Sequence, residues 1–306
     1  MRFLYLLVIS FVFITTTAFT INKTYKVPAV EKEQLLVFDN RYEKTALPSL
    51  PLLKEGVVYP VVSAQSVFMM DVDSAVPLYE KNPDGKFLPA STTKMVTALV
   101  SLDFYPMDAV LRINSIRSVG QRMRLVAGEE ISVENLLYGL LVFSANDAAD
   151  VLAANYYGGR EAFVAAMNDK AKELNLENTV FVNPSGLDSA AQVTTARDLA
   201  RIAAVAMENV KFREFVATKN KIVTSADGSI VHRLTNINSL LGEVEGVLGV
   251  KTGWTENARE NLVTYVDRDG KKVVIVVLGS QDRFGETKEL IEWVYSSYHW
   301  REVKPS

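Results

Sequence analysis

A serine and a lysine at a spacing of three form the first group in this sequence that could do covalent chemistry. Ser91 and Lys94 follow Pro89 and lead into a helix-compatible run, 95–99. On a helix this spacing places both side chains on one face, a turn apart, so the Lys94 amine can reach the Ser91 hydroxyl. A lysine acts as a base near neutral pH when burial or a nearby cation lowers its pKa from about 10.4 to roughly 7 or 8. About one such pair occurs by chance in a chain of this length, so the pair alone is weak evidence. We expect Ser91 to be a nucleophile and Lys94 its base only if partner groups occur elsewhere in the sequence.

A polar interruption in a core-like apolar segment gives the second group. Ser144 and Asn146 stand within 140–149, where most neighbours are leucine, valine, phenylalanine or alanine. Polar groups inside such a segment require hydrogen-bond partners. One interpretation is a helix cap, a position that serine and asparagine favour. The functional interpretation makes Ser144 a proton relay and Asn146 a clamp for a substrate.

The third group is Lys251, Thr252 and Gly253, which follow the apolar run 247–250. This run predicts a strand at the edge of a sheet, where Gly253 lets another backbone approach closely. A cation and a hydroxyl are the groups that hold a free carboxylate. Taken alone, the triplet favours an ordinary strand end that exposes a lysine.

Together and in this order, the groups match Ser-x-x-Lys, Ser-x-Asn and Lys-Thr-Gly, the signature of serine DD-peptidases and β-lactamases. From Val61 to Trp300 the chain resembles the low-molecular-weight D-alanyl-D-alanine carboxypeptidase family. Besides the three motifs, the resemblance is carried by 181–188, 194–200, 235–238, 249–255 and Arg283-Phe284. One departure is Arg259, which follows Ala258 where the family usually has glycine. The strand that follows the site is therefore expected to differ in shape.

The resemblance implies a mechanism and a role for each residue. Ser91 attacks the carbonyl between two D-alanines of a peptidoglycan stem peptide, an acyl-enzyme forms, and water releases the shortened peptide. The implied catalytic residues are Ser91, Lys94, Ser144 and Asn146, with Asn146 holding the substrate amide. The implied substrate-binding residues are Lys251, Thr252, Gly253, Trp254 and Arg283, and the backbone N–H groups of Ser91 and Trp254 form the oxyanion hole. β-Lactam antibiotics are the expected covalent inhibitors.

The sequence patterns of the segments that must position these residues predict an α+β fold. Short β-type runs stand towards both ends of the chain, and helical periodicity dominates 91–216 between them. We expect an antiparallel sheet flanked by helices, with a mostly helical subdomain. The expected elements are a hairpin of 66–72 and 77–79 around Asp73-Ser74, a hairpin of 261–266 and 271–278 around Asp269-Gly270, and a closing helix, 285–298.

The N-terminus predicts export. Arg2 precedes a mostly apolar run, 3–14, and a short stretch that ends at Ala18. This pattern is typical of a signal peptide, with cleavage favoured after Ala18, or of an uncleaved membrane anchor. We expect 1–21 to be this segment, 22–60 to be an extended linker or arm, and 61–302 to be the catalytic domain, located in the cell envelope and attached to a membrane only through the N-terminal segment.

Composition excludes several other classes. The formal net charge of -3, with scattered basic residues, argues against a nucleic-acid partner. The chain has no cysteine and only two histidines, His232 and His299, which we interpret as surface or packing residues. A Ser-His-Asp hydrolase and a metal enzyme are therefore disfavoured, and we expect no cofactor and no metal. The remaining alternatives are a β-lactamase, a catalytically idle peptidoglycan-binding relative, and an endopeptidase that cleaves D-alanyl cross-links.

Overall fold

An antiparallel sheet is the frame of the fold. The computed structural model describes residues 48–115 and 118–303, so the predicted export segment and most of the predicted arm lie outside the described residues. Within them, a five-stranded sheet has the order β3-β2-β10-β9-β8, and all neighbouring strands are antiparallel. The bounds are Pro77–Lys81 for β3, Ser66–Asp71 for β2, Lys271–Ser280 for β10, Arg259–Arg268 for β9 and Val247–Thr255 for β8. Strands from both ends of this part of the chain complete one sheet, as predicted.

The turn between β9 and β10 shows why these strands pair in this register. Asp269 and Gly270 have φ values of 53° and 75°. A two-residue hairpin turn with positive φ at both central residues has a twist that matches the twist of the flanking strands. Asp-Gly is well suited to this turn. The hairpin predicted around Asp269-Gly270 is therefore confirmed, and so is the one predicted around Asp73-Ser74, which joins β2 to β3.

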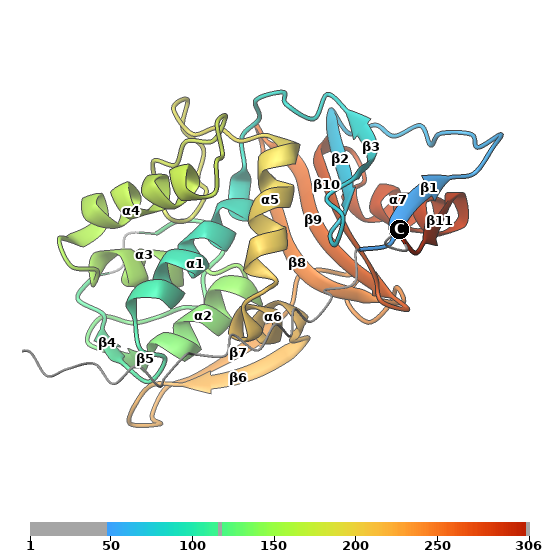
Figure 1. The fold of residues 1–306 in the computed structure, drawn as a ribbon. Helices are drawn as coiled ribbons and strands as arrows, with labels where there is room; N and C mark the ends of the chain where they lie inside the picture. Colours follow the sequence, from blue (N-terminus) through green and yellow to red (C-terminus); the bar gives the residue numbers. More distant parts are fainter. Residues whose placement is uncertain (1–47, 116–117, 304–306) are drawn as a thin grey trace, which may run out of the picture. The chain divides into compact units, whose positions relative to one another are not determined.

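Helices cover both faces of the sheet (Figure 1), with α5 (Ala196–Ala206) on one face and α7 (Arg283–Ser297) on the other. Side chains of a strand point alternately to its two faces. In β10, Val274 and Val276 belong to the core shared with α5, whereas Val273 and Ile275 belong to the core shared with α7. This double burial explains the continuous apolar run of the strand.

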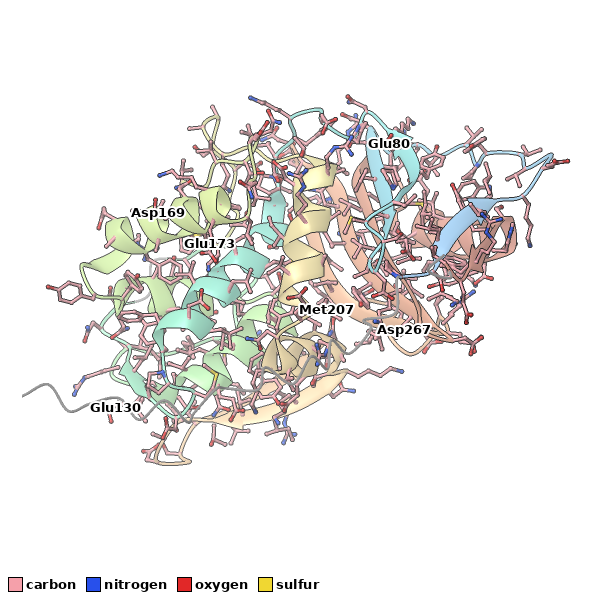
Figure 2. All side chains as sticks on the ribbon, in the orientation of Figure 1. Glu80, Glu130, Asp169, Glu173, Met207 and Asp267 are labelled. Carbon is pink, nitrogen blue, oxygen red and sulfur yellow. The ribbon has the colours of Figure 1, made fainter. Side chains whose placement is uncertain are left out.

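The remaining helices form the predicted helical part around a central helix. The 3₁₀ turn η1 (Ala90–Thr93) runs directly into α1 (Lys94–Phe104), whose residues 94–101 are all buried. Helix α1 contacts α2 (Val133–Leu141), α3 (Asn146–Ala154), α4 (Gly159–Glu173) and α5. A last helix of this part is α6 (Val210–Ala217). Exposed carboxylates such as Glu80 and Glu130 lie at the margin of the molecule (Figure 2).

Three two-stranded sheets were not predicted. They pair β4 (Val110–Arg112) with β5 (Glu130–Ser132), β6 (Asn220–Thr224) with β7 (Val231–Thr235), and β1 (Leu50–Leu53) with β11 (Tyr298–Arg301). Strands of three to five residues are too short to give a clear period of two in the sequence.

Strand β1 shows that the folded region begins earlier in the chain than predicted. Its residues belonged to the predicted arm, 22–60, but they pair with the last strand of the chain. The Tyr59 ring lies 5.4 Å from that of Trp293, measured between ring centroids. The end of the predicted arm, from residue 50, is therefore part of the same compact unit as the region that follows it. None of the helices in the described residues has the length and apolar character needed to cross a bilayer.

Candidate active site

The turn that carries Ser91 is held against the sheet by β8 and β9. The buried Asn261 side chain donates through Nδ2 to the carbonyl oxygens of Leu88 and Pro89, at 2.9 and 3.2 Å. On β8, a Cβ atom added to Gly253 would lie 3.2 Å from the backbone nitrogen of Ser91. Gly253 therefore permits the close backbone approach expected from the sequence. Asn261, which sequence analysis missed, fixes the segment that precedes Ser91.

The amine of Lys94 is buried and surrounded by three oxygen atoms. Its Nζ lies 2.8 Å from Ser91 Oγ, 2.7 Å from Asn146 Oδ1 and 2.5 Å from the carbonyl oxygen of Ser185. A neutral amine has two N–H donors and one lone pair. It can donate to the amide oxygen and the carbonyl while its lone pair accepts the proton of the Ser91 hydroxyl. The three contacts therefore fit a lysine that acts as a base.

Burial gives Lys94 a pKa suited to that role. Loss of solvation lowers the pKa of Lys94 to about 7, and the negative charges of Asp150 and Asp147 partly oppose this shift. Burial disfavours the charged form of an amine, because the surroundings replace its hydration poorly. Near neutral pH a large fraction of Lys94 is thus unprotonated, the form that a base requires.

A second buried lysine contacts the second serine. Nζ of Lys251 lies 2.8 Å from Ser144 Oγ and 3.0 Å from the carbonyl oxygen of Thr252. Ser144 stands between α2 and α3 with a φ of 60°, a left-handed conformation that is unusual for serine. Burial, and next the charges of Lys94 and Arg283, lower the pKa of Lys251 well below its ordinary value. Serine and lysine are therefore paired twice in this site.

The interpretation of Ser144 and Asn146 as helix caps is wrong. The N-cap of α3 is Ala145, and no side chain caps this helix. Asn146 instead accepts from Lys94 through Oδ1 and donates through Nδ2 to the Val119 carbonyl oxygen at 2.7 Å. The second hydrogen of Nδ2 stays available for another acceptor.

A tight loop presents the Ser185 carbonyl to Lys94. Asn183 Oδ1 accepts N–H groups from Ser185, Gly186 and Leu187 at 3.2, 2.8 and 3.1 Å. Gly186 has a φ of 85°, and a Cβ atom there would lie 1.9 Å from the carbonyl oxygen of Ala90. The sequence marked this stretch only through family resemblance and gave no role to Ser185.

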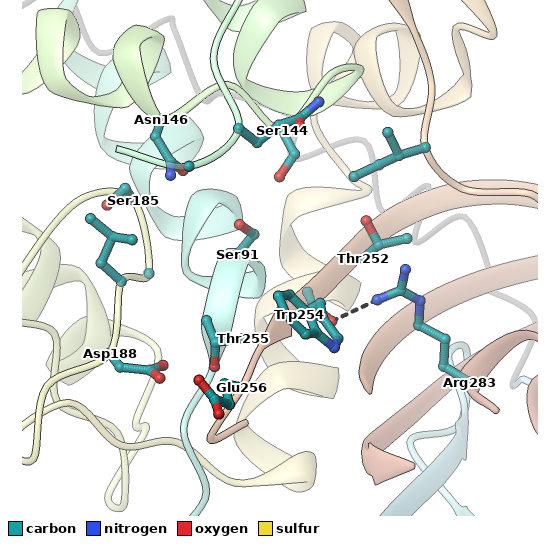
Figure 3. Close-up of a pocket in the computed structure, with 16 residues that line it drawn as sticks. Ser91, Ser144, Asn146, Ser185, Asp188, Thr252, Trp254, Thr255, Glu256 and Arg283 are labelled. Carbon is teal, nitrogen blue, oxygen red and sulfur yellow. Dashed lines mark hydrogen bonds between the residues drawn. The ribbon is translucent and has the colours of Figure 1, made fainter. Parts of the chain in front are cut away.

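One cavity of about 660 Å³ collects the predicted residues (Figure 3). All of them line it except Lys94 and Lys251, which lie behind Ser91 and Ser144. Arg283 donates from Nη1 to the Gly253 carbonyl oxygen at 2.8 Å. The lining also includes residues that were not predicted: Gly120, Gln121, Ser185, Gly186, Leu187, Asp188, Ile237, Thr255 and Glu256. The cavity therefore brings the three sequence motifs to one place.

Two buried polar atoms at this cavity lack a partner in the described part of the chain. They are Thr252 Oγ1 and Arg283 Nε. A hydroxyl oxygen and a guanidinium nitrogen that are buried without partners are poised to bind an oxygen-rich group such as a carboxylate.

Arg259 is the first residue of the strand that follows the site. Strand β9 pairs with β8 in unbroken register from Thr255↔Arg259 back to Gly249↔Tyr265, whereas its pairing with β10 is irregular between Val277 and Ser280, which lies opposite Glu260. The expected difference in strand shape from the family stays a prediction. Arg259 has a φ of 59°, in the left-handed region that glycine adopts without strain. The departure from the family pattern therefore falls on the first residue of β9, directly after the turn, and places strain there.

The histidines take no part in the site. His232 is buried, with Nε2 2.7 Å from Glu129 Oε1 and Nδ1 2.9 Å from the Met123 carbonyl oxygen. His299 is exposed on β11. Both are the packing and surface residues that the sequence predicts.

Comparisons with known proteins agree with the motifs. A model of the D-alanyl-D-alanine carboxypeptidase family, peptidase family S11, matches residues 54–282. The D-alanyl-D-alanine carboxypeptidase DacF of Bacillus subtilis is 30% identical over 246 residues, which are 77% of this chain and 63% of DacF. A D-alanyl-D-alanine endopeptidase of Pseudomonas aeruginosa is 34% identical over 261 residues, which are 82% of this chain and 83% of that protein. The chain thus spans less than two thirds of DacF but most of the endopeptidase.

Solved structures show the same fold. The crystal structure of the Streptomyces K15 DD-transpeptidase has a TM-score of 0.73 and 32% identity, and the match covers 78% of this chain and all of that one. An evolved penicillin-binding protein homologue of Mycobacterium tuberculosis has a TM-score of 0.76 and 30% identity, over 83% of this chain and all of the other. The α+β fold and the family resemblance predicted from the sequence are confirmed, and the chain belongs to the D-alanyl-D-alanine carboxypeptidase family.

Proposed function

We propose that the protein is a serine-type D-alanyl-D-alanine carboxypeptidase that removes the terminal D-alanine from peptidoglycan stem peptides through an acyl-enzyme on Ser91. The observation that carries this proposal is the 2.8 Å contact between Ser91 Oγ and the buried amine of Lys94. The contact lies at a cavity that Thr252 and Arg283 also line. Nucleophile, base and carboxylate-binding groups are therefore available to one bound dipeptide.

Acylation uses the two serine–lysine pairs in turn. Lys94 takes the proton of Ser91, and Oγ attacks the carbonyl carbon that links the two D-alanines. The backbone N–H groups of Ser91 and Trp254 stabilise the oxyanion that develops. The C–N bond then breaks, and Ser144, which contacts Lys251, passes its hydroxyl proton to the leaving amine. The proton held by Lys94 replaces it on Ser144, so that Lys94 is neutral again before deacylation. Free D-alanine leaves and the shortened peptide remains as an ester on Ser91.

Deacylation regenerates the enzyme. Lys94 takes a proton from a water molecule, whose oxygen attacks the ester carbonyl, and the proton returns to Ser91 Oγ as the ester bond breaks. Asn146 keeps one N–H to hold the amide of the peptide during both steps. The product is a peptide that is one D-alanine shorter.

The terminal carboxylate of the substrate orients the substrate in the cavity. Thr252 Oγ1 and Arg283 Nε lack partners in the described residues. Lys251 directly precedes Thr252 in the sequence, and the charge of Arg283 acts on the Lys251 amine. A β-lactam also has a carboxylate beside a reactive amide, so it can occupy the same groups and acylate Ser91. We therefore include β-lactam antibiotics as covalent inhibitors.

The location follows from the substrate. Peptidoglycan lies outside the cytoplasmic membrane, so the enzyme must be exported to the cell envelope, with 1–21 as signal peptide or membrane anchor and 61–302 as the core of the catalytic region. Cell fractionation of the full chain tests this part, because a protein found in the cytoplasm would contradict it.

The direct test of function is the release of D-alanine from a purified stem pentapeptide. The wild-type protein should release it, and Ser91→Ala should not. A protein that instead hydrolyses penicillin with rapid turnover and leaves the pentapeptide intact would be a β-lactamase. A protein that binds peptidoglycan but does neither would be an idle relative.

A further inference from the structure

Asn146 is held by a loop that forms part of the wall of the active-site cavity. Its backbone N–H donates to the Gln121 carbonyl oxygen and its Nδ2 to the Val119 carbonyl oxygen, both at 2.7 Å. Gly120 lies between these two residues in the chain and lines the cavity, as do Gln121 and Asn146 (Figure 3). Residues 119–125, here called the wall loop, therefore bind Asn146 through both its main chain and its side chain.

The contact with Val119 determines which way the Asn146 amide is turned. Oδ1 accepts from Lys94 Nζ at 2.7 Å, while Nδ2 donates to the Val119 carbonyl oxygen. An amide rotated by half a turn would place its oxygen against that carbonyl oxygen, and two acceptors cannot share a hydrogen bond. The wall loop therefore selects the orientation in which the second N–H of Nδ2 remains for a substrate.

A buried carboxylate fastens the wall loop to α3. The Asp147 side chain accepts the N–H groups of Met123 at 3.0 Å and of Leu125 at 3.1 Å. Asp147 is 1% exposed and stands in the first turn of α3, where it also accepts the N–H of Ala148 at 3.1 Å. A buried charge is costly unless hydrogen bonds replace its hydration, and bonds to an ionised acceptor are stronger than bonds between neutral groups. Asp147 is therefore a firm anchor for the loop.

The other side of the wall loop is held by β7. His232 Nδ1 lies 2.9 Å from the Met123 carbonyl oxygen, and His232 Nε2 lies 2.7 Å from Oε1 of the fully buried Glu129 side chain. Met123 is thus held through its N–H by Asp147 and through its carbonyl by His232. A shift of the wall loop relative to Asn146 has to break hydrogen bonds to both α3 and β7.

We propose that Asp147 is a positioning residue for acylation: it holds the wall loop so that the Asn146 amide presents its remaining N–H to the amide of the substrate. This inference rests on the proposed function, because it uses the role proposed there for Asn146. Asp147 acts through the loop and not on the reacting atoms. Its loss should therefore weaken one specific contact with the substrate.

Two penicillins distinguish this role from a general effect on the fold or on the base. Benzylpenicillin carries an amide on its β-lactam ring, and the carbonyl oxygen of that amide can accept the free N–H of Asn146. 6-Aminopenicillanic acid has the same reactive ring and the same carboxylate, but an amine replaces the amide. A misplaced Asn146 should slow acylation by benzylpenicillin far more than acylation by 6-aminopenicillanic acid. A disturbed fold or base should slow both equally.

The first test compares Asp147→Asn with Asp150→Asn in the full chain. The Asp150 carboxylate is paired with Arg160, and its charge, like that of Asp147, raises the pKa of Lys94. Both variants should lower that pKa and shift the rise of the acylation rate to lower pH. Above this rise, Asp147→Asn should reduce the ratio of the benzylpenicillin rate to the 6-aminopenicillanic acid rate about tenfold, the loss expected for one hydrogen bond. Asp150→Asn should leave this ratio unchanged.

A change on the loop tests the same contact without altering Asp147. A Cβ atom added to Gly120, which has a φ of 76°, would lie 3.2 Å from Asn146 Nδ2. Gly120→Ala should therefore displace the amide and lower the ratio about threefold or more. Gly128→Ala is the matched control, because Gly128 has a φ of 87° and no atom within 4 Å of the added Cβ. It should leave the ratio unchanged.

Thermal unfolding shows which variants are folded. A folded Asp147→Asn protein with the wild-type ratio, or an equal fall of the ratio in Asp150→Asn, would overturn the proposal. If Asp147→Asn does not fold, Gly120→Ala decides: a lowered ratio supports the positioning role and an unchanged ratio refutes it. Wild-type protein that forms an acyl-enzyme with neither penicillin would instead contradict the proposed function.

Discussion

Lys251 Nζ lies 2.8 Å from Ser144 Oγ, the separation that also joins Lys94 to Ser91. Both amines are buried, and the charge of Lys94 contributes to the low pKa of Lys251. Two buried lysines whose charges repel each other cannot easily both carry a proton. The free site therefore favours the neutral form of both amines. An anionic ligand shifts the equilibrium of Lys251 towards its protonated form.

Binding of a carboxylate ligand should take up protons. A negative charge next to Lys251 stabilises its protonated form and raises the pKa of Lys251 from the low value of the free protein. Calorimetry of a D-Ala-D-Ala peptide binding to Ser91→Ala protein at pH 8, in buffers of different ionisation enthalpy, measures the uptake. Lys251→Gln should take up fewer protons. Equal heats in all buffers would contradict this account.

The rate of acylation should follow the titration of Lys94. The reactive form is the neutral amine, and the pKa of Lys94 is about 7. The rate constant for acylation by penicillin should therefore rise about tenfold per pH unit below that pKa and level off above it. Lys94→Arg stays charged and should lose about 10²–10⁴-fold in rate. A rate that is constant or falls between pH 5.5 and 8 would exclude Lys94 as the base.

Replacement of Gly186 tests the loop that faces Ser91. Gly186→Ala adds a Cβ atom 1.9 Å from the Ala90 carbonyl oxygen at a φ of 85°. The loop or the Ser91 turn must move, and we expect acylation to slow more than tenfold. Gly228→Ala is the matched control, since Gly228 has a φ of 75° and no atom near the added Cβ. It should destabilise the protein by about 1 kcal/mol without slowing acylation. Equal rates in both variants would refute the positioning role.

Arg259→Gly should stabilise the protein. The left-handed conformation at a φ of 59° costs an L-residue about 1–2 kcal/mol, and the extra chain entropy of glycine returns about half of this. We expect the free energy of unfolding in urea to rise by about 0.5–1 kcal/mol. Arg259→Ala removes the same side chain but keeps the strain, so it should give no gain. Equal stability of the two variants would disprove the strain.

The sequence predicted the elements with strong local patterns. The Asp269-Gly270 hairpin and the closing helix have clear turn and periodicity signals, and the structure confirms them. The pairing of β1 with β11 joins residues almost 250 positions apart, and no local pattern reports such a contact. The predicted arm was therefore too long by the residues of β1 and those that follow it.

For the site, the motifs identified the reactive side chains but not the Ser185 carbonyl or Asn261. Ser91, Ser144 and Thr252 were predicted from residue type and spacing, and they line one cavity. The Ser185 carbonyl acts through its backbone, which every residue has, so its type gave no signal. Asn261 resembles any polar residue in a strand until its bonds to the Ser91 turn are seen.

The central claim is that Ser91 forms the covalent intermediate. Intact-mass spectrometry of the protein after incubation with benzylpenicillin, followed by peptide mapping, tests it most directly. We predict one penicilloyl adduct, located on the peptide that contains Ser91, and no adduct on Ser91→Ala. An adduct at another residue, or equal labelling of Ser91→Ala, would contradict the account.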